Sequence, residues 1–169
     1  MDKGYSHFIK DNRGAHIKYY TGLDDEFKVD EVYATWNKKH TLRGYHGSKK
    51  QRKKIKVLNG SVRLILIDLN DNLIKIYDKV DNTKDPIFVD LNCFVGYLSL
   101  EDNTVVSYVV SGNFNTGYEL TYNPLTVPDL WNNEEINVET DSINISEKDS
   151  NALPLEELSN MKIEFEEQF

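Results

Sequence analysis

The chain holds few of the side chains that usually bind metals or act as nucleophiles. Its four histidines, His7, His16, His40 and His46, show no spacing that would place two imidazoles on one helical turn. The single cysteine, Cys93, cannot complete a zinc site with them. The sequence also contains neither a glycine-rich phosphate loop nor a serine in a nucleophile elbow. We therefore predict a site without a metal ion.

Short motifs spread along the chain become informative when they are taken in order. They are DNRG at 11–14, LRGYHG at 42–47, Lys53 seven residues before Gly60, GYLSLEDNTVVSY at 96–108, ISEKD at 145–149 and PLEEL at 154–158. In this order they resemble the dTDP-4-dehydrorhamnose 3,5-epimerase family. The resemblance covers almost the whole chain, with an uncertain register around residues 113–127.

The resemblance implies an all-β fold, a cupin-type double-stranded β-helix (jelly-roll barrel) with a short C-terminal helix, as one domain over residues 1–169. It implies an isomerase that epimerises C3, C5 or both centres of a nucleotide-linked 4-keto-deoxysugar, in the biosynthesis of deoxysugars or bacterial surface polysaccharides. A ketone at C4 acidifies the hydrogens at C3 and C5, because the carbanion delocalises as an enolate. Inversion then needs a base, an acid on the opposite face and a group that stabilises the enolate, but no cofactor. Members of the family are usually homodimers that exchange N-terminal strands.

By resemblance, four side chains perform this chemistry. His46 is the base, and Asp149 hydrogen-bonds its other ring nitrogen and so fixes the tautomer. Lys53 stabilises the enolate oxygen, and Tyr108 returns a proton from the opposite face of the sugar. The residues alone leave other roles open, since Asp149 could cap the helix that follows it and Tyr108 could be a core aromatic.

The resemblance also implies substrate-binding residues. Arg43 and Arg13 match positions that bind the diphosphate of a dTDP- or GDP-linked sugar, since guanidinium geometry suits phosphate oxygens. Arg13 could equally be an ordinary turn residue. The chain departs from the family at Val95, where a second histidine normally contacts the sugar. Valine can neither donate to a sugar oxygen nor transfer a proton, so the pocket takes a differently substituted sugar, inverts one centre only, or has lost the reaction.

Short strands must hold these residues in place. The candidate strands are rich in β-branched and aliphatic residues and lie at 55–58, 62–69, 73–80, 86–89, 97–100 and 105–110. Turn-forming pairs separate them, at residues 59–60, 71–72 and 102–103. This spacing is typical of a β-sandwich or barrel. Strand alternation places Lys54 on the opposite face from Lys53, and the spacing to the turn favours Lys53 over Lys54 and Lys56.

The C-terminal third is expected to be less regular. Residues 113–131 show little periodicity and are predicted to form a long loop. Only residues 154–158 resemble a helix, with Pro154 suited to its first turn. We see neither an internal repeat nor a linker, which supports a single domain.

The composition limits the partners and the location. The 169 residues carry a net charge of -8, with 39% apolar and 28% charged residues, as in a folded globular domain. Nine of the twenty lysines and arginines fall between Lys38 and Lys56 with no acid among them, which suits a compact anion such as a diphosphate better than nucleic acid. No apolar run approaches the ~20 residues of a membrane helix. Because the first residues are not those of a signal peptide, we expect a cytoplasmic protein without a membrane or nucleic-acid partner.

Two other functions stay open at this point. A nucleotide-sugar 3,4-ketoisomerase would use the same base and enolate but would move the carbonyl. A non-catalytic barrel that binds sugar nucleotides would fit the valine at position 95.

Overall fold

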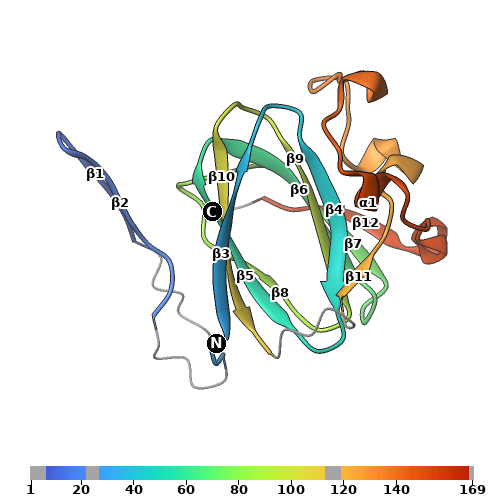
Figure 1. Ribbon diagram of the computed structural model, residues 1–169, viewed down its shortest axis with the longest axis horizontal. Coiled ribbons are helices and arrows are strands. Elements are labelled where there is room, and N and C mark those ends of the chain that lie inside the picture. The colour runs from blue at the N-terminus through green and yellow to red at the C-terminus, as the bar shows by residue number, and fades with distance from the viewer. Residues whose placement is uncertain (1–6, 22–26, 113–118, 168–169) are drawn as a thin grey trace.

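Two facing β-sheets form most of the molecule (Figure 1). The computed structural model describes residues 7–21, 27–112 and 119–167. The four-stranded sheet has the order β3 (Glu31–Asn37), β10 (Thr104–Ser111), β5 (Arg52–Asn59) and β8 (Ile87–Val89). The six-stranded sheet has the order β11 (Glu119–Thr121), β4 (Leu42–Ser48), β9 (Cys93–Ser99), β6 (Ser61–Asp68), β7 (Leu73–Asp81) and β12 (Lys162–Phe165). Among the described strands only β12 pairs in parallel, with β7. The all-β barrel expected from the sequence is confirmed.

Two hydrophobic cores lie on the two faces of the six-stranded sheet. The barrel core lies between the sheets and consists of Ile55, Val57, Val62, Leu64, Leu66, Val80, Ile87, Val89, Cys93, Val95, Tyr97, Val106, Tyr108 and Val110. The outer core lies between the sheet and the C-terminal segment and consists of Leu42, Tyr45, Ile65, Ile67, Ile74, Ile76, Phe94, Leu98, Leu130, Trp131, Val138, Leu155, Leu158 and Met161. The six-stranded sheet is therefore covered on both sides.

β6 shows how this arrangement follows from the sequence. Every residue from Ser61 to Ile67 is buried. Leu64 and Leu66 belong to the barrel core, whereas Ile65 and Ile67 belong to the outer core. A strand that is buried on both faces is apolar throughout instead of alternating.

Tight turns join the strands where the sequence predicts them. Gly60, between β5 and β6, has a φ of +71°, and a Cβ there would lie 2.3 Å from Oγ1 of Thr104. Asn72 and Asn103 have φ values of 55° and 57°, and asparagine tolerates this left-handed conformation. The predicted turns at residues 59–60, 71–72 and 102–103 are confirmed.

The C-terminal third contains more regular structure than the sequence predicts. Within the expected loop at 113–131, the structure has β11 and two 3-10 helices, η1 (Pro124–Thr126) and η2 (Pro128–Leu130). Residues 113–118 of that prediction lie outside the described residues. A third 3-10 helix, η3 (Thr140–Ser142), precedes the short α-helix α1 (Glu147–Ser150). A short C-terminal helix is thus present, and none of the described helices is long and apolar enough to cross a membrane.

The helix predicted at 154–158 begins two residues later and is a 3-10 helix, with Pro154 ahead of it and not in its first turn. This part of the chain enters a 3-10 helix, η4 (Glu156–Asn160). Leu155 and Leu158 are both buried in the outer core. A 3-10 helix has three residues per turn, so it lets two leucines three residues apart face the same way.

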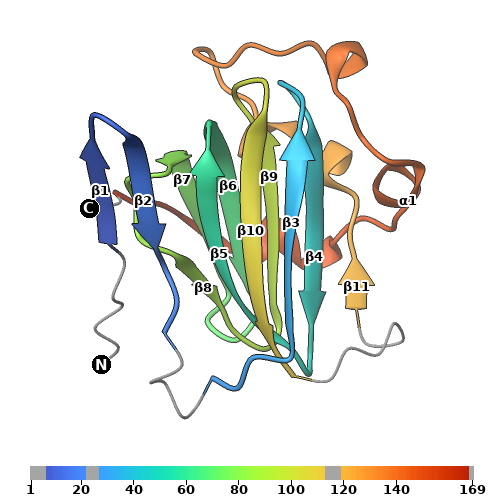
Figure 2. The ribbon, with the colours of Figure 1, turned by 60° about the vertical axis from the view of Figure 1, so that its left-hand side comes forward.

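A two-stranded hairpin stands apart from the barrel (Figure 1 and Figure 2). β1 (His7–Asp11) pairs with β2 (Gly14–Lys18) in a sheet of its own, with Asn12 and Arg13 in the turn. Most side chains of β2 are exposed. The DNRG motif is therefore the tip of a projecting hairpin.

Candidate functional site

A bulge in β4 brings the motif residues Arg43 and His46 to the same face of the sheet. Arg43 lies opposite Tyr97 of β9, and His46 lies opposite Val95, so three steps along β4 match two along β9. In a regular strand, a spacing of three would send the two side chains to opposite faces. The extra residue makes both face the barrel interior with Tyr97 and Val95.

Two glycines let the backbones of β4 and β9 meet at this bulge. Gly44 has a φ of +145°, and a Cβ on it would lie 2.7 Å from Cα of Gly96. A Cβ on Gly96 would lie 2.6 Å from Cδ1 of Tyr45 and 2.8 Å from the carbonyl oxygen of Arg43. Since real Cβ atoms do not approach so closely, packing requires both glycines of the sequence motifs.

His46 is hydrogen-bonded to Asp149, 103 residues further along the chain. Nε2 of His46 lies 2.7 Å from Oδ1 of Asp149, whose side chain is only 5% exposed. Oδ2 of the same carboxylate accepts from the backbone N–H of Gly44 at 3.4 Å. A carboxylate can only accept, so Nε2 carries a hydrogen, and in the neutral imidazole Nδ1 then has the free lone pair. The pair can therefore use Nδ1 as a base while Asp149 stabilises the imidazolium.

The surroundings of Asp149 keep its carboxylate ionised. Burial by itself would raise the pKa of Asp149, but the hydrogen bond and charge of His46 lower it, as do hydrogen bonds with Gly44 and Ser146. The net pKa lies below the ordinary value. Ser146, and not Asp149, is the N-cap of α1, because its side chain accepts from the backbone N–H of Asp149 at 3.1 Å. The N-cap of the helix that follows, η4, is Leu155, so the alternative of Asp149 as the cap of that helix is wrong.

On β5, Lys53 faces the barrel interior, whereas Lys54 and Lys56 do not. Lys53 is 5% exposed, and burial lowers its pKa below the ordinary value although nearby carboxylates act in the opposite direction. Lys54 lies over the ring of Phe27, 4.9 Å from the centroid. Lys56 donates to the carbonyl of Lys84. Strand alternation therefore selects Lys53 among the three lysines, as predicted.

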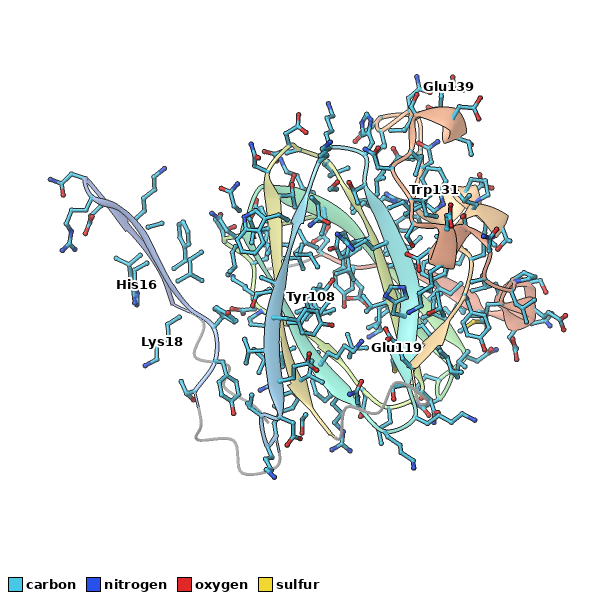
Figure 3. All side chains as sticks on the ribbon, viewed as in Figure 1. His16, Lys18, Tyr108, Glu119, Trp131 and Glu139 are labelled. Carbon is cyan, nitrogen blue, oxygen red and sulfur yellow. The ribbon has the colours of Figure 1, made fainter. Side chains whose placement is uncertain are left out.

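Tyr108 faces the barrel interior from β10. It lies opposite Tyr33 of β3, and the two rings stack with centroids 4.6 Å apart and planes at 14°. Burial is the main cause that raises the pKa of Tyr108 well above the ordinary value, and Tyr97 and Tyr33 add to it. The phenol is therefore protonated at neutral pH, which is the state that a proton donor needs. Figure 3 shows Tyr108 in the space between the two sheets.

Arg43 and Val95 complete the set of predicted residues in the barrel. Nε of Arg43 donates to Oδ1 of Asn37 at 2.7 Å. Val95 is 5% exposed and faces the barrel beside His46. The wall next to His46 is apolar at the position where the resemblance implies a second histidine.

Further charged residues that the motifs did not identify surround a small cavity. This cavity of about 120 Å³ is lined by Glu31, Tyr33, Gln51, Lys53, Val110 and Glu119. Oε1 of Glu119 lies 3.8 Å from Nδ1 of His46, and Oε2 lies 3.8 Å from Nζ of Lys148. Glu31 and Tyr33 alternate along β3, a signal that could have indicated an inward face. Glu119 lies in the stretch predicted to be a loop, where the sequence shows no strand pattern.

Arg13 lies apart from the other candidate site residues of its own chain. Its Nη2 lies 2.6 Å from Oδ2 of Asp11 at the tip of the hairpin, and its side chain is 85% exposed. Figure 3 shows His16 and Lys18 of the same hairpin well away from Tyr108 and Glu119. The structure therefore leaves Arg13 outside the site that its own chain forms.

The potential metal ligands are dispersed. In the described parts of the chain, no three His, Cys, Asp or Glu side chains are grouped so that they could hold a metal ion. Cys93 is buried in the barrel core, and burial is the main cause that raises its pKa to about 12. It packs as a protonated thiol.

Known proteins resemble this chain in sequence and in fold. A family model described as dTDP-4-dehydrorhamnose 3,5-epimerase matches residues 5–157. No curated protein sequence matches the chain significantly.

Solved structures with the same fold cover most of the chain. NovW of Streptomyces spheroides, a 4-keto-6-deoxy sugar epimerase, has a TM-score of 0.73 at 19% identity, over 92% of this chain and 82% of its own. RmlC of Streptococcus suis, in complex with dTDP-D-xylose, has a TM-score of 0.72 at 23% identity, over 93% of this chain and 87% of its own. ChmJ, a 3'-monoepimerase of Streptomyces bikiniensis in complex with dTDP-quinovose, has a TM-score of 0.70 at 21% identity, over 94% of this chain and 86% of its own. The expected cupin-type jelly roll is confirmed.

Proposed function

Because the chain belongs to the dTDP-4-dehydrorhamnose 3,5-epimerase family, we propose that it inverts C3, C5 or both centres of a dTDP-linked 4-keto-6-deoxy sugar. The observation that carries the proposal is the hydrogen bond of 2.7 Å between His46 and Asp149. His46 faces the same barrel interior as the buried side chains of Lys53 and Tyr108. This interior therefore holds a base, a cation and a protonated phenol.

Each of these groups has one step in the proposed reaction. Nδ1 of His46 removes the proton from the carbon beside the ketone, and Asp149 stabilises the imidazolium that forms. The electron pair moves onto the C4 oxygen, where Lys53 stabilises the enolate charge. Tyr108 then donates its proton to the opposite face of the same carbon. One proton leaves the carbon and another replaces it, so the sugar needs no cofactor. The His46 imidazolium then gives its proton to water and the Tyr108 phenolate takes one from water, which restores both groups for the next turnover.

A separate part of the site binds the nucleotide diphosphate of the substrate. Arg43, oriented by Asn37, binds the diphosphate through its guanidinium. The relatives crystallised with dTDP-quinovose and dTDP-D-xylose favour a dTDP-linked substrate over a GDP-linked one. Val95 supplies an apolar contact to the sugar ring and favours inversion of a single centre, since it provides no proton donor there.

We place Arg13 in the site of a second copy. The hairpin projects from its own barrel, so exchange of hairpins in a homodimer would carry Arg13 to the partner's diphosphate. Mixing Arg13→Ala with His46→Ala after unfolding and refolding tests this idea. We expect hybrid dimers to regain part of the activity, because one site then holds both His46 and a partner arginine. No regain in a confirmed hybrid would exclude exchange of Arg13.

Hydrogen exchange in deuterated water tests the main proposal. The protein is incubated with a dTDP-linked 4-keto-6-deoxyhexose, with the GDP-linked sugar as a parallel sample, and C3 and C5 are followed by NMR. Loss of the hydrogen at C3 alone identifies a 3-epimerase, and loss at both centres a 3,5-epimerase. A new ketone position would instead identify the ketoisomerase. Binding without exchange would contradict both enzymatic functions and favour the binding barrel.

A further inference from the structure

The side chain of Asn37 connects the two sheets of the barrel beside the arginine that we assign to the diphosphate. Asn37 is the last residue of β3, in the four-stranded sheet, and Arg43 lies on β4, in the six-stranded sheet. Nε of Arg43 donates to Oδ1 of Asn37 at 2.7 Å. Asn37 is 3% exposed, so water competes weakly for this bond. The arginine of one sheet is therefore held by an amide of the other.

The nitrogen of the same amide is bonded within the four-stranded sheet. Nδ2 of Asn37 donates to the carbonyl oxygen of Thr104 at 3.0 Å, and Thr104 of β10 lies opposite Asn37 in the strand register. Nδ2 also donates to Oγ1 of Thr35 at 3.2 Å. A rotated amide would lose both acceptors and would place two donors, Nδ2 and Nε of Arg43, against each other. The direction of Oδ1, and with it the direction of Arg43, is therefore fixed by β3 and β10.

The contact with Asn37 leaves the outer nitrogens of Arg43 available to a ligand. Within the described parts of the chain, Asn37 is the one hydrogen-bond partner of the Arg43 side chain, and no carboxylate pairs with it. An amide oxygen is a neutral acceptor, so it orients the guanidinium without compensating its charge. Both Nη groups keep their N–H bonds for phosphate oxygens, which an arginine binds through two parallel hydrogen bonds.

We propose that Asn37 is a positioning residue for the diphosphate, whose neutral amide oxygen directs Arg43 and leaves its full charge to the phosphates. This inference rests on the proposed function and deepens it. Two properties of Asn37 are required together. Its acceptor fixes the guanidinium, and its neutrality keeps the guanidinium cationic toward the ligand. An ionised side chain at this position would keep the first property and remove the second.

Two substitutions separate these properties. Asn37→Ala removes the acceptor, so Arg43 loses its fixed direction. Asn37→Asp keeps an acceptor of the same shape but adds a negative charge, which pairs with Arg43 and repels a diphosphate. Asn132→Asp is the matched control, because the Asn132 amide also bonds backbone groups, the N–H and the carbonyl of Val138, but in the outer core and not in the barrel.

Binding of dTDP and of thymidine separates a loss at the diphosphate from a general loss of the site. For Asn37→Ala we expect the Kd of dTDP, measured by calorimetry, to rise about tenfold, and for Asn37→Asp about thirtyfold. The Kd of thymidine, which has no phosphate, should change less than about threefold in an NMR titration, which also shows that each variant is folded. Asn132→Asp should change neither Kd. An unchanged Kd of dTDP in either Asn37 variant, or an equal rise for thymidine, would overturn the inference.

The kinetic constants for a dTDP-linked 4-keto-6-deoxy sugar give a second distinction. In Asn37→Ala we expect KM to rise about tenfold and kcat to fall less than about threefold, because the groups that transfer protons are unchanged. A fall in kcat at an unchanged KM would assign Asn37 to the chemical step and would contradict a role at the diphosphate.

A third measurement tests the contact without any ligand. In protein labelled with 15N, the Nε–H resonance of Arg43 is identified by its absence in Arg43→Lys. A buried hydrogen bond protects this hydrogen, so its exchange with water should become at least about tenfold faster in Asn37→Ala and stay unchanged in Asn132→Asp. Unchanged exchange in Asn37→Ala overturns the inference. If the wild-type protein binds dTDP but inverts no sugar, the proposed reaction fails while the Kd of dTDP and the Nε–H exchange still test Asn37.

Discussion

The two faces of the six-stranded sheet are both buried, yet they differ in chemistry. β4 supplies Leu42 and Tyr45 to the outer core, whereas its Arg43 and His46 face the barrel interior. The outer core is apolar except for the buried Arg63, which donates to the carbonyl of Leu130 and pairs with Asp78, and it is covered by the C-terminal segment around Trp131. The barrel interior mixes apolar residues with charged and hydroxyl groups. Burial alone therefore does not distinguish a functional face from a structural one.

The difference lies in how the polar groups are satisfied. On the inner face, His46 bonds Asp149 and Arg43 bonds Asn37. On the outer face, Arg63 bonds the Leu130 carbonyl and Asp78, whereas the buried hydroxyl of Tyr45 has no hydrogen-bond partner among the described residues. Removing charged groups from water costs free energy. We therefore expect the outer core to contribute more to the free energy of unfolding than the inner face does.

Loss of the base should have the largest effect, and only on the inner face. For His46→Ala we expect hydrogen exchange to fall at least about 10³-fold, within the range that positioned acid–base groups contribute. The affinity for dTDP should stay within about tenfold, or ~1.4 kcal/mol, because Arg43 is untouched. Exchange measured by NMR and dTDP binding measured by calorimetry check both expectations. Unchanged exchange would refute the assignment of the base.

Loss of the central outer-core ring should affect stability first. Trp131 is fully buried, and its Nε1 donates to the carbonyl of Pro124 at 2.9 Å. Trp131→Ala should lower the free energy of unfolding by about 3–5 kcal/mol. Trp36 is 72% exposed, and Trp36→Ala, the control, should change it by less than about 0.5 kcal/mol. Urea unfolding measures both, and equal effects would contradict the assignment of the outer core.

A methyl group at the bulge should affect both faces. In Gly96→Ala the new Cβ meets the Tyr45 ring of the outer core and the Arg43 carbonyl. We expect a loss of about 1–3 kcal/mol in stability from overpacking. Because Arg43 and His46 flank the bulge, the exchange rate should fall as well. A variant with full stability and full activity would show that the close approach of β4 and β9 is not required.

The smallest expected effect is a change in the pH dependence of stability. The pKa of Asp149 is lower in the folded protein than its ordinary value, so its contribution to stability is present above the ordinary pKa and is lost as pH falls through the folded one. Asp149→Asn should therefore be less stable near neutral pH, by on the order of 1 kcal/mol. The difference from wild type should shrink in acid, as urea unfolding at several pH values can show. A difference that grows toward acid would have the wrong sign for this carboxylate.

Part of the site could be predicted from residue order because local rules govern it. Lys53 faces the barrel by strand alternation, and Gly60 occupies a turn whose conformation favours glycine. The faces of Arg43 and His46 could not be derived from alternation, since the bulge between them reverses it. Glu119 could not be predicted for another reason. The sequence of β11 has no strand periodicity, and its strand conformation depends on its pairing with β4.

The sequence by itself determined the all-β class, the turns and the order of motifs that identifies the family, since periodicity and turn chemistry act over a few residues. Only the tertiary structure decided which groups meet. It brought Asp149 to His46 across 103 residues, it placed Asn37 within hydrogen-bonding distance of Arg43, and it left Arg13 on a separate hairpin. Pairing between strands and packing between sheets join distant parts of the chain, and no local pattern records those partners.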